Sequence, residues 1–410
     1  MSDTKAVTAK NGTAPDVLIA GAGLGGLLLA ALLERVDIPY QIFERASELR
    51  SLGAAISIGP SILPVFEQLG LMEELKKISL PCNSLDLYNV DVKKLGSFNL
   101  GEQKATTGYN TILIARPQLY ELLRKQVPAQ KISLGKKVLR IEESDGKVRI
   151  FCADNSSYSG DILVGADGAY SAVRQSLYKN LDKKELLPKS DLGELSVGYI
   201  SLVGISEPQD PEKYPQLKDD FCHFAQILGH KGMGWSVISV PNNQICWGLG
   251  IQLSESDAKE QQFRNSEWGP ESSEAMIQEL RDLPCAWGGT MREIVDATPR
   301  NLISKVFLEA KLFSTWYHGR TVLLGDAAHK MLPGAGVGAV NAMHDAVVLA
   351  NCLYNMSDST PKCIEAAFQD YYRERYPRAE EQYARSEDMS KVIFGHVKHG
   401  TRFFAQIRAT

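Results

Sequence analysis

The sequence predicts an α/β fold in which a parallel-sheet domain is interleaved with a mixed β-sheet domain and followed by C-terminal helices. Three observations predict this arrangement. An apolar stretch with closely spaced glycines begins the fold at residues 16–33. Two later apolar runs each end in an acidic residue, within residues 161–174 and 321–350. Residues 190–290 instead alternate between apolar and polar side chains, as the strands of a half-buried sheet do.

The composition restricts the classes of partner. The chain has 410 residues and a net charge of −4 with both signs interspersed, so we expect no nucleic-acid partner. Its seven cysteines form no C-x-x-C pair, which argues against zinc or a disulfide framework and predicts no metal. Widely spaced thiols indicate a reducing, cytoplasmic location. Residues 1–15 are predicted to be a disordered tail.

The apolar stretch DVLIAGAGLGGLLLAALL has three interpretations: a membrane span, a secretion signal, or a buried strand, turn and helix. A span needs about 20 apolar residues, and each glycine costs about 1 kcal/mol in a helix interior. Two lysines precede the stretch, as in a signal peptide. The glycine spacing favours the third interpretation, because Gly21, Gly23 and Gly26 form G-x-G-x-x-G. No transmembrane segment is therefore expected.

Each glycine of this turn has a separate physical role. Gly21 permits the bend from strand to helix, Gly23 lets a pyrophosphate approach the backbone, and Gly26 lets the helix press against the strand. The phosphates would lie at a helix N-terminus, where free N–H groups favour negative charge. Glu44 ends the next strand, 18 positions after Gly26, near where a ribose-binding acid is expected. These residues predict an adenine dinucleotide site.

Further signals follow in order along the chain. Residues 52–71 read as a Gly/Ala-rich loop that runs into a helix. Arg116 stands before Pro117, a residue typical of the first helical position.

The two acid-ended runs predict two more turns at the edge of the sheet. Asp167 ends the run DILVGAD, and a β-hairpin with its turn at residues 144–147 precedes that run. Asp326 ends the run TVLLGD, where a carboxylate can bind a ribityl hydroxyl. Residues 333–341 are too glycine-rich for a helix and predict a loop, and a helix follows them.

Together these motifs resemble the single-component (class A) FAD-dependent aromatic hydroxylases, which share the p-hydroxybenzoate hydroxylase fold. The family includes salicylate and urate hydroxylases, zeaxanthin epoxidase and fungal natural-product monooxygenases. The resemblance covers most of the chain, from near Asp16 to near Tyr383. It implies a Rossmann-like FAD-binding domain (GxGxxG), a mixed β-sheet substrate domain and C-terminal helices.

The resemblance also implies a discontinuous division of the chain. The FAD-binding domain is expected at residues 16–80, 108–185 and 295–360, the substrate-binding sheet at 81–107 and 186–294, and the C-terminal helices at 361–410.

The implied FAD contacts come from all of these motifs. Arg116 is expected near the diphosphate and the ribityl chain. Backbone N–H groups before the helix that follows residue 341 are expected near flavin N1 and the C2 carbonyl. Many relatives carry glutamine where Val337 stands, so one side-chain contact is expected to be missing here. The predicted cofactor-binding residues are Gly21, Gly23, Leu24, Gly26, Glu44, Arg45, Ala55, Ser57, Arg116, Val138, Asp167, Asp326, Gly336, Gly338 and Ala339.

The implied reaction uses non-covalent FAD with NADPH or NADH as a transient co-substrate, because the chain has no second glycine fingerprint for a resident nicotinamide cofactor. O2 would add at flavin C4a, and the hydroperoxide would hydroxylate or epoxidise a substrate. Pro333 is expected beside the isoalloxazine ring and is the leading catalytic-site candidate. We interpret His329 as a structural hydrogen-bonding residue rather than a base.

The substrate side is predicted from the strand-like residues 190–290. Phe224, Trp235 and Trp247 are the candidate substrate contacts, with core packing as the alternative for each. His223 is a candidate general base, because its reference pKa lies near neutrality; a structural role is the alternative. No arginine in this stretch plainly binds a carboxylate, so we expect an apolar, multi-ring aromatic or prenylated small molecule.

The C-terminal segment 391–410 mixes apolar and basic residues and is too short and too charged to span a bilayer. We expect an amphipathic helix packed on the core, with peripheral contact to a membrane or a second subunit as the alternative. The sequence is compatible with a monomer or a homodimer.

Two other functional classes are compatible with the same motifs. A flavin-dependent reductase or dehydrogenase of this fold would act without O2. A non-catalytic flavin-binding protein would show no NADPH oxidation in response to any ligand.

Overall fold

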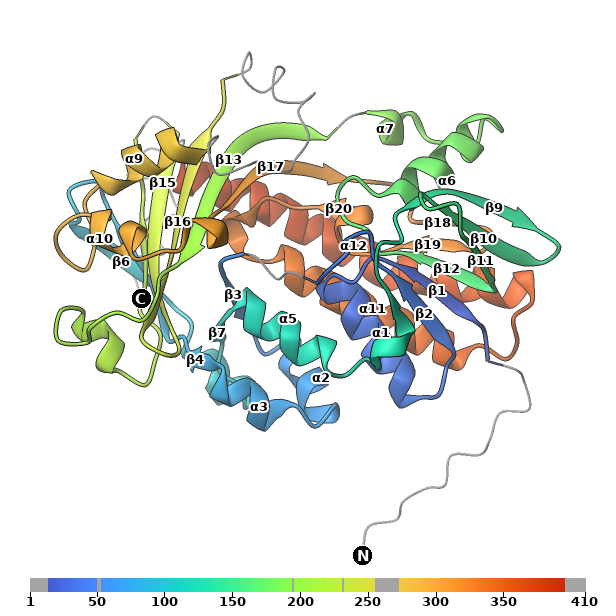
Figure 1. The fold of residues 1–410 in the computed structure, drawn as a ribbon, viewed down its shortest axis with the longest axis horizontal. Helices are drawn as coiled ribbons and strands as arrows, with labels where there is room; N and C mark the ends of the chain where they lie inside the picture. Colours follow the sequence, from blue (N-terminus) through green and yellow to red (C-terminus); the bar gives the residue numbers. More distant parts are fainter. Residues whose placement is uncertain (1–13, 50–52, 194, 231, 255–272, 395–410) are drawn as a thin grey trace, which may run out of the picture.

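The structure, a computed structural model, describes residues 14–49, 53–193, 195–230, 232–254 and 273–394. Figure 1 shows a parallel sheet at one end of the molecule and the long strands of a second sheet at the other. The predicted tail therefore lies mostly outside the described residues, as do residues 395–410 of the predicted C-terminal helices.

The first sheet has the strand order β18-β19-β12-β1-β2-β8, and all its pairs are parallel except β18 with β19. All four residues of β1 are buried, as expected for a parallel strand covered on both faces. Helix α1 (Leu24–Arg35) follows β1 after the glycine turn and packs on β1 and β2. The strands are β1 (Val17–Ala20), β2 (Tyr40–Phe43), β8 (Ile132–Ser133), β12 (Ile162–Gly165), β18 (Tyr317–His318) and β19 (Thr321–Leu323).

A three-stranded antiparallel sheet packs beside the parallel one. It consists of β9 (Val138–Ser144), β10 (Lys147–Cys152) and β11 (Ser157–Gly160). Ser144 pairs with Lys147, so the β9–β10 turn has two residues, Asp145 and Gly146, both with positive φ. The predicted hairpin is therefore confirmed.

The second large sheet has eight strands in the order β20-β17-β13-β16-β15-β14-β5-β6. Its middle is antiparallel, and β14 pairs with β5 in parallel, which makes the sheet mixed as predicted. The strands are β5 (Ser84–Tyr88), β6 (Lys94–Asn99), β13 (Ser196–Ile205), β14 (Phe224–Ile227), β15 (Met233–Val240), β16 (Gln244–Gln252), β17 (Ser304–Leu312) and β20 (His329–Lys330).

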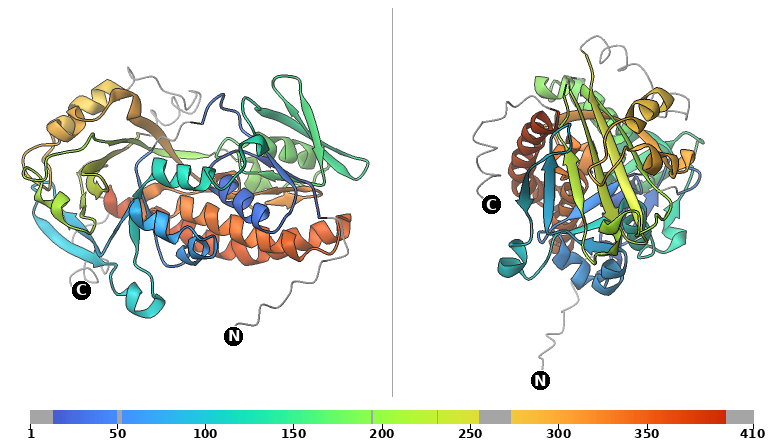
Figure 2. Two further views of the ribbon diagram at one scale, coloured as in Figure 1. Left: turned by 60° about the horizontal axis from the view of Figure 1, so that its bottom comes forward. Right: turned by 90° about the vertical axis from the view of Figure 1, so that its left-hand side faces the viewer.

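Different helices cover the two faces of this sheet. Helices α9 (Glu274–Arg281) and α10 (Arg292–Asp296) lie on one face, and α12 (Pro361–Ile393) lies on the other (Figure 2). Trp235 and Trp247 are core residues of the α9/α10 face. The opposite face of the central strands is turned toward α12.

Three predicted boundaries differ in the structure. Strands β17 and β20 belong to the eight-stranded sheet, although residues 295–360 were assigned to the FAD-binding domain. Helix α11 (Gly338–Asn355) begins inside the predicted 333–341 loop, because a glycine is tolerated at the first helical position, where the amide has no partner within the helix. The predicted C-terminal helices are, within the described residues, the single helix α12, which accommodates Pro377.

None of the described helices is long and apolar enough to cross a membrane.

The remaining elements connect the two large sheets. These connecting elements are β3 (Ala55–Ile58), α2 (Leu63–Gln68), α3 (Met72–Lys77), β4 (Ser79–Pro81), α4 (Gln103–Thr107), β7 (Ile112–Ala115), α5 (Arg116–Arg124), α6 (Ala172–Asp182) and α7 (Lys189–Leu192).

Candidate active site

A cavity of about 400 Å³ lies at the carboxyl ends of β1, β2 and β12. This edge is where ligands bind in open α/β sheets. Seven of the predicted cofactor-binding residues line the cavity together: Gly21, Gly23, Glu44, Arg45, Arg116, Val138 and Asp167.

The glycine turn has the geometry that the sequence predicts. Gly21 has φ +104°, and a Cβ there would lie 2.4 Å from the carbonyl oxygen of Ala166. A Cβ on Gly26 would lie 2.2 Å from the carbonyl oxygen of Gly21, so the helix and the turn are in close contact. Gly23 has no neighbouring atom within 4 Å of its ideal Cβ position. The backbone at Gly23 is therefore open to an approaching phosphate, whereas Leu24, the first residue of α1, is buried.

Glu44 fixes this turn as well as lining the cavity. Its Oε2 accepts a hydrogen bond from the amide of Ala22 at 2.9 Å, and its Oε1 accepts one from the amide of Ala46 at 2.9 Å. The carboxylate thus joins the end of β2 to the glycine turn. Arg45 is exposed next to it.

Asp167 contributes a buried carboxylate with one unpaired oxygen. Its Oδ2 accepts hydrogen bonds from the amides of Ala172 (2.7 Å) and Val173 (3.2 Å) at the start of α6. Oδ1 is buried in the cavity wall and has no partner among the described residues. Burial raises the pKa of Asp167 above its usual value. A buried polar atom of this kind is normally satisfied by a ligand or by water.

Arg174 ties the loops of the two predicted acids together. Its guanidinium donates to the carbonyl oxygens of Ala169 (2.6 Å) and Ala327 (3.0 Å) and lies on the ring of Phe313. These two carbonyls follow Asp167 and Asp326 in sequence. We therefore assign Arg174 a structural role that holds the acidic ends of β12 and β19 next to each other.

Asp326 follows β19 in the short turn Gly325–Ala327 and forms an ion pair that the sequence analysis missed. The Nζ of Lys330 lies 2.6 Å from its Oδ2. Burial alone would raise the pKa of Asp326, but the ammonium of Lys330 lowers it below its usual value. Asp326 in turn raises the pKa of Lys330. The i, i+4 spacing in DAAHK was the available signal for this pair.

The loop before α11 is held against α12. A Cβ on Gly334 would lie 2.5 Å from Oγ of Ser390, so only glycine allows this contact. Gly336 has φ +65°, a conformation that favours glycine. Pro333 and Gly336 are exposed, and α11 begins at Gly338, with the half-buried Ala339 next.

A second cavity, of about 770 Å³, reaches this loop from the side of β3. Ser57 and Gly336 of the predicted cofactor set line it, together with Val337. Ala55 lies at the start of β3, where its amide donates to Sγ of Cys246 at 3.1 Å. The residues predicted to contact the flavin thus lie around β3 and the start of α11, and both segments are separated in sequence from the glycine turn.

A buried network centred on Asp345 supports the Gly325–Ala327 turn. Its Oδ2 accepts a bond from the amide of Gly325 (2.8 Å) and interacts with Nε2 of His329 (2.5 Å). Its Oδ1 accepts a bond from Nε of Arg375 at 2.7 Å. Burial raises the pKa of Asp345, but His329 and Arg375 outweigh it and lower this pKa to about 2. The contact of its buried Nε2 with Asp345 supports the interpretation of His329 as a structural hydrogen-bonding residue.

The tryptophans predicted to contact substrate have partners in the core. Nε1 of Trp235 donates to the carbonyl oxygen of Pro284 at 2.9 Å, and Nε1 of Trp247 donates to Oγ1 of Thr298 at 2.9 Å. Both indoles pack with α9 and α10, on the face of the sheet that is turned away from α12. This geometry corrects the prediction: alternation along a strand identifies two faces but does not say which one faces the substrate.

Phe224 and His223 occupy different surroundings. Phe224 packs against a cluster that also touches Ala54 and Ala55, so it lies on the face of the sheet toward Ala55, a predicted flavin contact. Nε2 of His223 lies 2.7 Å from the carboxylate of Asp219 in the segment before β14. His223 lines neither of the two cavities described above, and this arrangement gives no support to its role as a base.

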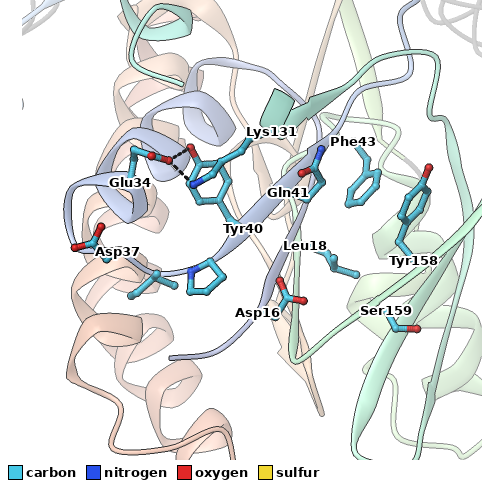
Figure 3. A pocket seen from close by; sticks show the side chains of 12 residues that line it. Asp16, Leu18, Glu34, Asp37, Tyr40, Gln41, Phe43, Lys131, Tyr158 and Ser159 are labelled. Atoms are coloured by element: carbon cyan, nitrogen blue, oxygen red, sulfur yellow. Dashed lines mark hydrogen bonds and ion pairs between the residues drawn. The ribbon is translucent and has the colours of Figure 1, made fainter. Parts of the chain in front are cut away.

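A separate pocket of about 540 Å³ lies beside β1 and β2 (Figure 3). Glu34 accepts hydrogen bonds from Oη of Tyr40 (2.6 Å) and from Nζ of Lys131 (2.7 Å). Across the pocket, the rings of Phe43 and Tyr158 are in contact. This pocket contains a satisfied network and none of the predicted site residues among its described lining.

These features fit FAD, which carries phosphates together with ribose and ribityl hydroxyls. The open backbone at Gly23 suits the phosphates, and the unpaired oxygen of Asp167 suits a hydroxyl donor. Fold and site together define a dinucleotide-binding protein with a second, eight-stranded sheet.

The chain belongs to the FAD binding domain family, which it matches over residues 14–197 and 290–386, and within it to the FAD-dependent aromatic hydroxylases and monooxygenases. It is 30% identical over 403 residues to the FAD-dependent monooxygenase andE of Emericella variicolor, covering 92% of this chain and 82% of the relative. It is 28% identical over 377 residues to the aurachin C monooxygenase/isomerase of Stigmatella aurantiaca, covering 92% and 89%.

Solved structures show the same fold. HpxO of Klebsiella pneumoniae, complexed with FAD and uric acid, superimposes with a TM-score of 0.75 at 22% identity and covers 96% of this chain and 93% of that one. The predicted family and fold class are therefore confirmed.

Proposed function

We propose that the protein uses FAD, O2 and NADPH or NADH to transfer one oxygen atom to an apolar, multi-ring aromatic or prenylated small molecule. Hydroxylation and epoxidation are both compatible with this assignment. The proposal extends the family membership to this chain's own reductant and substrate class.

The observation that carries the substrate class is the α12-facing side of the eight-stranded sheet. Val203, Ser236 and Gly248 lie on this side and stay half-buried in the middle of the sheet. A Cβ on Gly248 would meet its nearest neighbours, Ser236 Oγ and Val203 Cγ1, at the ordinary contact distances of 3.4 and 3.6 Å, so this position has room for a small added group. These three residues carry no charge, which suits an apolar substrate rather than a small benzoate.

The residues of the chain have separable tasks in this proposal. The glycine turn, Glu44, Arg116 and Asp167 hold the dinucleotide, while Asp326 and the N-terminal amides of α11 hold the flavin end. When bound, FAD supplies the two-electron chemistry that activates O2. Pro333 and Phe224 form the walls between which the substrate is positioned. The contact of Gly334 with Ser390 of α12 fixes the position of the 333–336 loop.

The test combines four measurements on purified protein loaded with FAD. We expect a yellow protein whose NADPH oxidation is stimulated by prenylated or multi-ring aromatic compounds, with matching O2 consumption, little hydrogen peroxide and a product containing one atom from 18O2. A simple hydroxybenzoate as the best substrate, with high coupling, overturns the substrate class. Substrate turnover without O2 identifies the enzyme as a reductase instead.

A further inference from the structure

The 770 Å³ cavity beside β3 has an apolar wall on α11 to which the proposed reaction gives no role. Val340, Val347 and Val348 line this wall, and His344 lies among them. The four residues follow the i, i+4, i+7, i+8 spacing of one helix face. Helix α11 also packs on α1 and α12, but these four side chains stay half-buried and have surface in the cavity.

A second wall of the cavity comes from earlier parts of the chain. Ile62 and Val65 line it at the beginning of α2, together with Leu100, which precedes α4. Val65 and Leu100 are half-buried, as the valines of α11 are. Aliphatic side chains from three separate segments therefore line one cavity, whose volume is in the range of small-molecule sites.

The charges of the cavity do not favour an ionic ligand. Among its described lining residues, the acidic and basic ones all belong to α12. Arg375 is buried in its pair with Asp345. The other four are exposed and carry two charges of each sign: Glu374, Glu381, Arg378 and Arg385.

His344 adds no charge to the apolar wall. Burial, more than the nearby Arg375, lowers the pKa of His344 below its usual value, so the imidazole is neutral at pH 7. An uncharged ligand therefore suits this cavity better than an anion or a cation.

One end of the cavity reaches the place where the flavin is expected. Ser57 and Gly336, two predicted flavin contacts, line it there. Gly336 lies three residues after Pro333, and Ser57 lies two residues after Ala55, which packs on the same cluster as Phe224. Pro333 and Phe224 are the walls proposed for the reacting part of the substrate. The cavity therefore begins close to that position and continues along α11.

We propose that this cavity binds an uncharged isoprenoid tail of the substrate, while the ring that receives oxygen lies at the flavin end. The stripe from Val340 to Val348 runs about 12 Å along the helix axis, which suits an extended chain. A tail laid on half-buried valines removes apolar surface of both partners from water. This inference rests on the proposed function, from which it takes the prenylated substrate and the position of the flavin.

The first experiment measures binding without turnover. FAD-loaded protein is titrated, in the absence of NADPH, with farnesyl hydroquinone and with hydroquinone, and the change in flavin absorbance gives both dissociation constants. The farnesyl compound should bind at least about tenfold more tightly, because each buried methylene group strengthens binding severalfold. Equal binding of the two compounds overturns the proposal.

Variants then test where the preference for the tail arises. Val347→Phe and Val65→Phe fill the cavity from two different helices, and each should lower the preference for the farnesyl compound about tenfold. Val36→Phe adds the same ring at a 37% exposed position at the end of α1 and should leave the preference unchanged. A preference that both cavity variants retain overturns the proposal.

The second experiment locates the tail by chemical protection. Val348→Cys places a thiol in the cavity, and N-ethylmaleimide should label this thiol several times more slowly when farnesyl hydroquinone is bound. Cys363 at the beginning of α12 lies outside the described lining of the cavity and serves as the internal control. Peptide mass spectrometry separates the two sites. Equal labelling of the Val348→Cys thiol with and without the compound overturns the proposal.

The failure of this inference is distinguishable from the failure of the proposed function. Tail-dependent binding that the cavity variants lose, without O2-dependent turnover of any prenylated compound, retains the tail site and removes the proposed function. Oxygenation of a prenylated compound with the same KM in Val347→Phe, Val65→Phe and the unmodified protein retains the function and removes the tail site.

Discussion

Asp345 in α11 and Arg375 in α12 form a buried ion pair, with 2.7 Å between Oδ1 and Nε. The other carboxylate oxygen accepts a bond from the amide of Gly325, next to Asp326. The pair therefore joins the two C-terminal helices to the turn that carries a predicted flavin contact. The contribution of this pair to the free energy of unfolding depends on the cost of leaving either charge buried alone.

Arg375→Met is expected to lower the free energy of unfolding by about 3–5 kcal/mol, because it removes the guanidinium from the buried Asp345 carboxylate and leaves Oδ1 without this bond. Arg373→Met, on the exposed side of the same helix, should change it by less than about 0.5 kcal/mol. Urea unfolding of both variants measures the difference. Equal effects of the two substitutions would show that the buried pair has no special weight.

The stability of the protein should fall in acid partly through Asp345. Its pKa is about 2 in the folded protein, against about 3.9 in an unfolded chain. A lowered carboxyl pKa stabilises the folded state above about pH 4, and this contribution is lost as the pH falls toward about 2. Asp345→Asn should therefore show a flatter loss of stability between these pH values than the unmodified protein. Parallel curves in a pH series of urea unfolding would contradict this.

Lys330→Met is expected to weaken FAD binding roughly 10- to 100-fold, since a hydrogen bond to a charged group contributes about 1.5–3 kcal/mol. The substitution leaves Asp326 without the ammonium that orients its carboxylate. Titration of apoprotein with FAD, followed by flavin fluorescence, gives the dissociation constant. Lys391→Met, which removes an exposed pair with Asp388, is the matched control and should bind FAD normally.

Two glycines of β16 should respond differently to alanine. A Cβ on Gly250 would lie 2.6 Å from the ring of Phe394, which stacks on Tyr199 with 4.3 Å between ring centres. Gly250→Ala should therefore destabilise the protein by about 1–3 kcal/mol, whereas Gly248→Ala has room and should be tolerated. Thermal unfolding distinguishes the two. A stable Gly250→Ala variant would mean that Phe394 is not held in this position in solution.

Phe224 and Trp247 test the two faces of the substrate sheet. Phe224→Ala should raise KM for the best substrate, because this ring lies on the face of the sheet toward the predicted flavin contact Ala55. Trp247→Phe should lower the free energy of unfolding by about 1–3 kcal/mol through the lost bond to Thr298, with KM unchanged. A KM effect from Trp247→Phe alone would restore the original prediction for that residue.

The parts of the site that the sequence predicts are those fixed by neighbours in the chain. The bend at Gly21, the contact at Gly26 and the hairpin at Asp145 depend on backbone conformation within a few residues, and their residue types report it. The same holds for Asp167, which caps the amides of the helix that follows it.

Other parts depend on partners that are distant in sequence. Arg375 and Asp345 are ordinary charged residues of two helices, and only the packing of α11 on α12 makes them a pair. Trp235 and Trp247 illustrate a different limit, since a period of two does not reveal which face of a strand meets the substrate. The i, i+4 spacing of Asp326 and Lys330 could have indicated their ion pair. These residues, however, span a turn and a strand rather than a helix, where that spacing is normally informative.

The Gly334–Ser390 contact has a consequence for how the protein is made. In the parallel sheet, β1 at the beginning of the chain pairs with β12, and β12 pairs with β19 in the last quarter of the chain. The 333–336 loop then packs on the end of α12. A nascent chain on the ribosome therefore has its glycine turn long before it has the support for the flavin end. The 333–336 loop therefore gains its full support only after residue 390 has been synthesised.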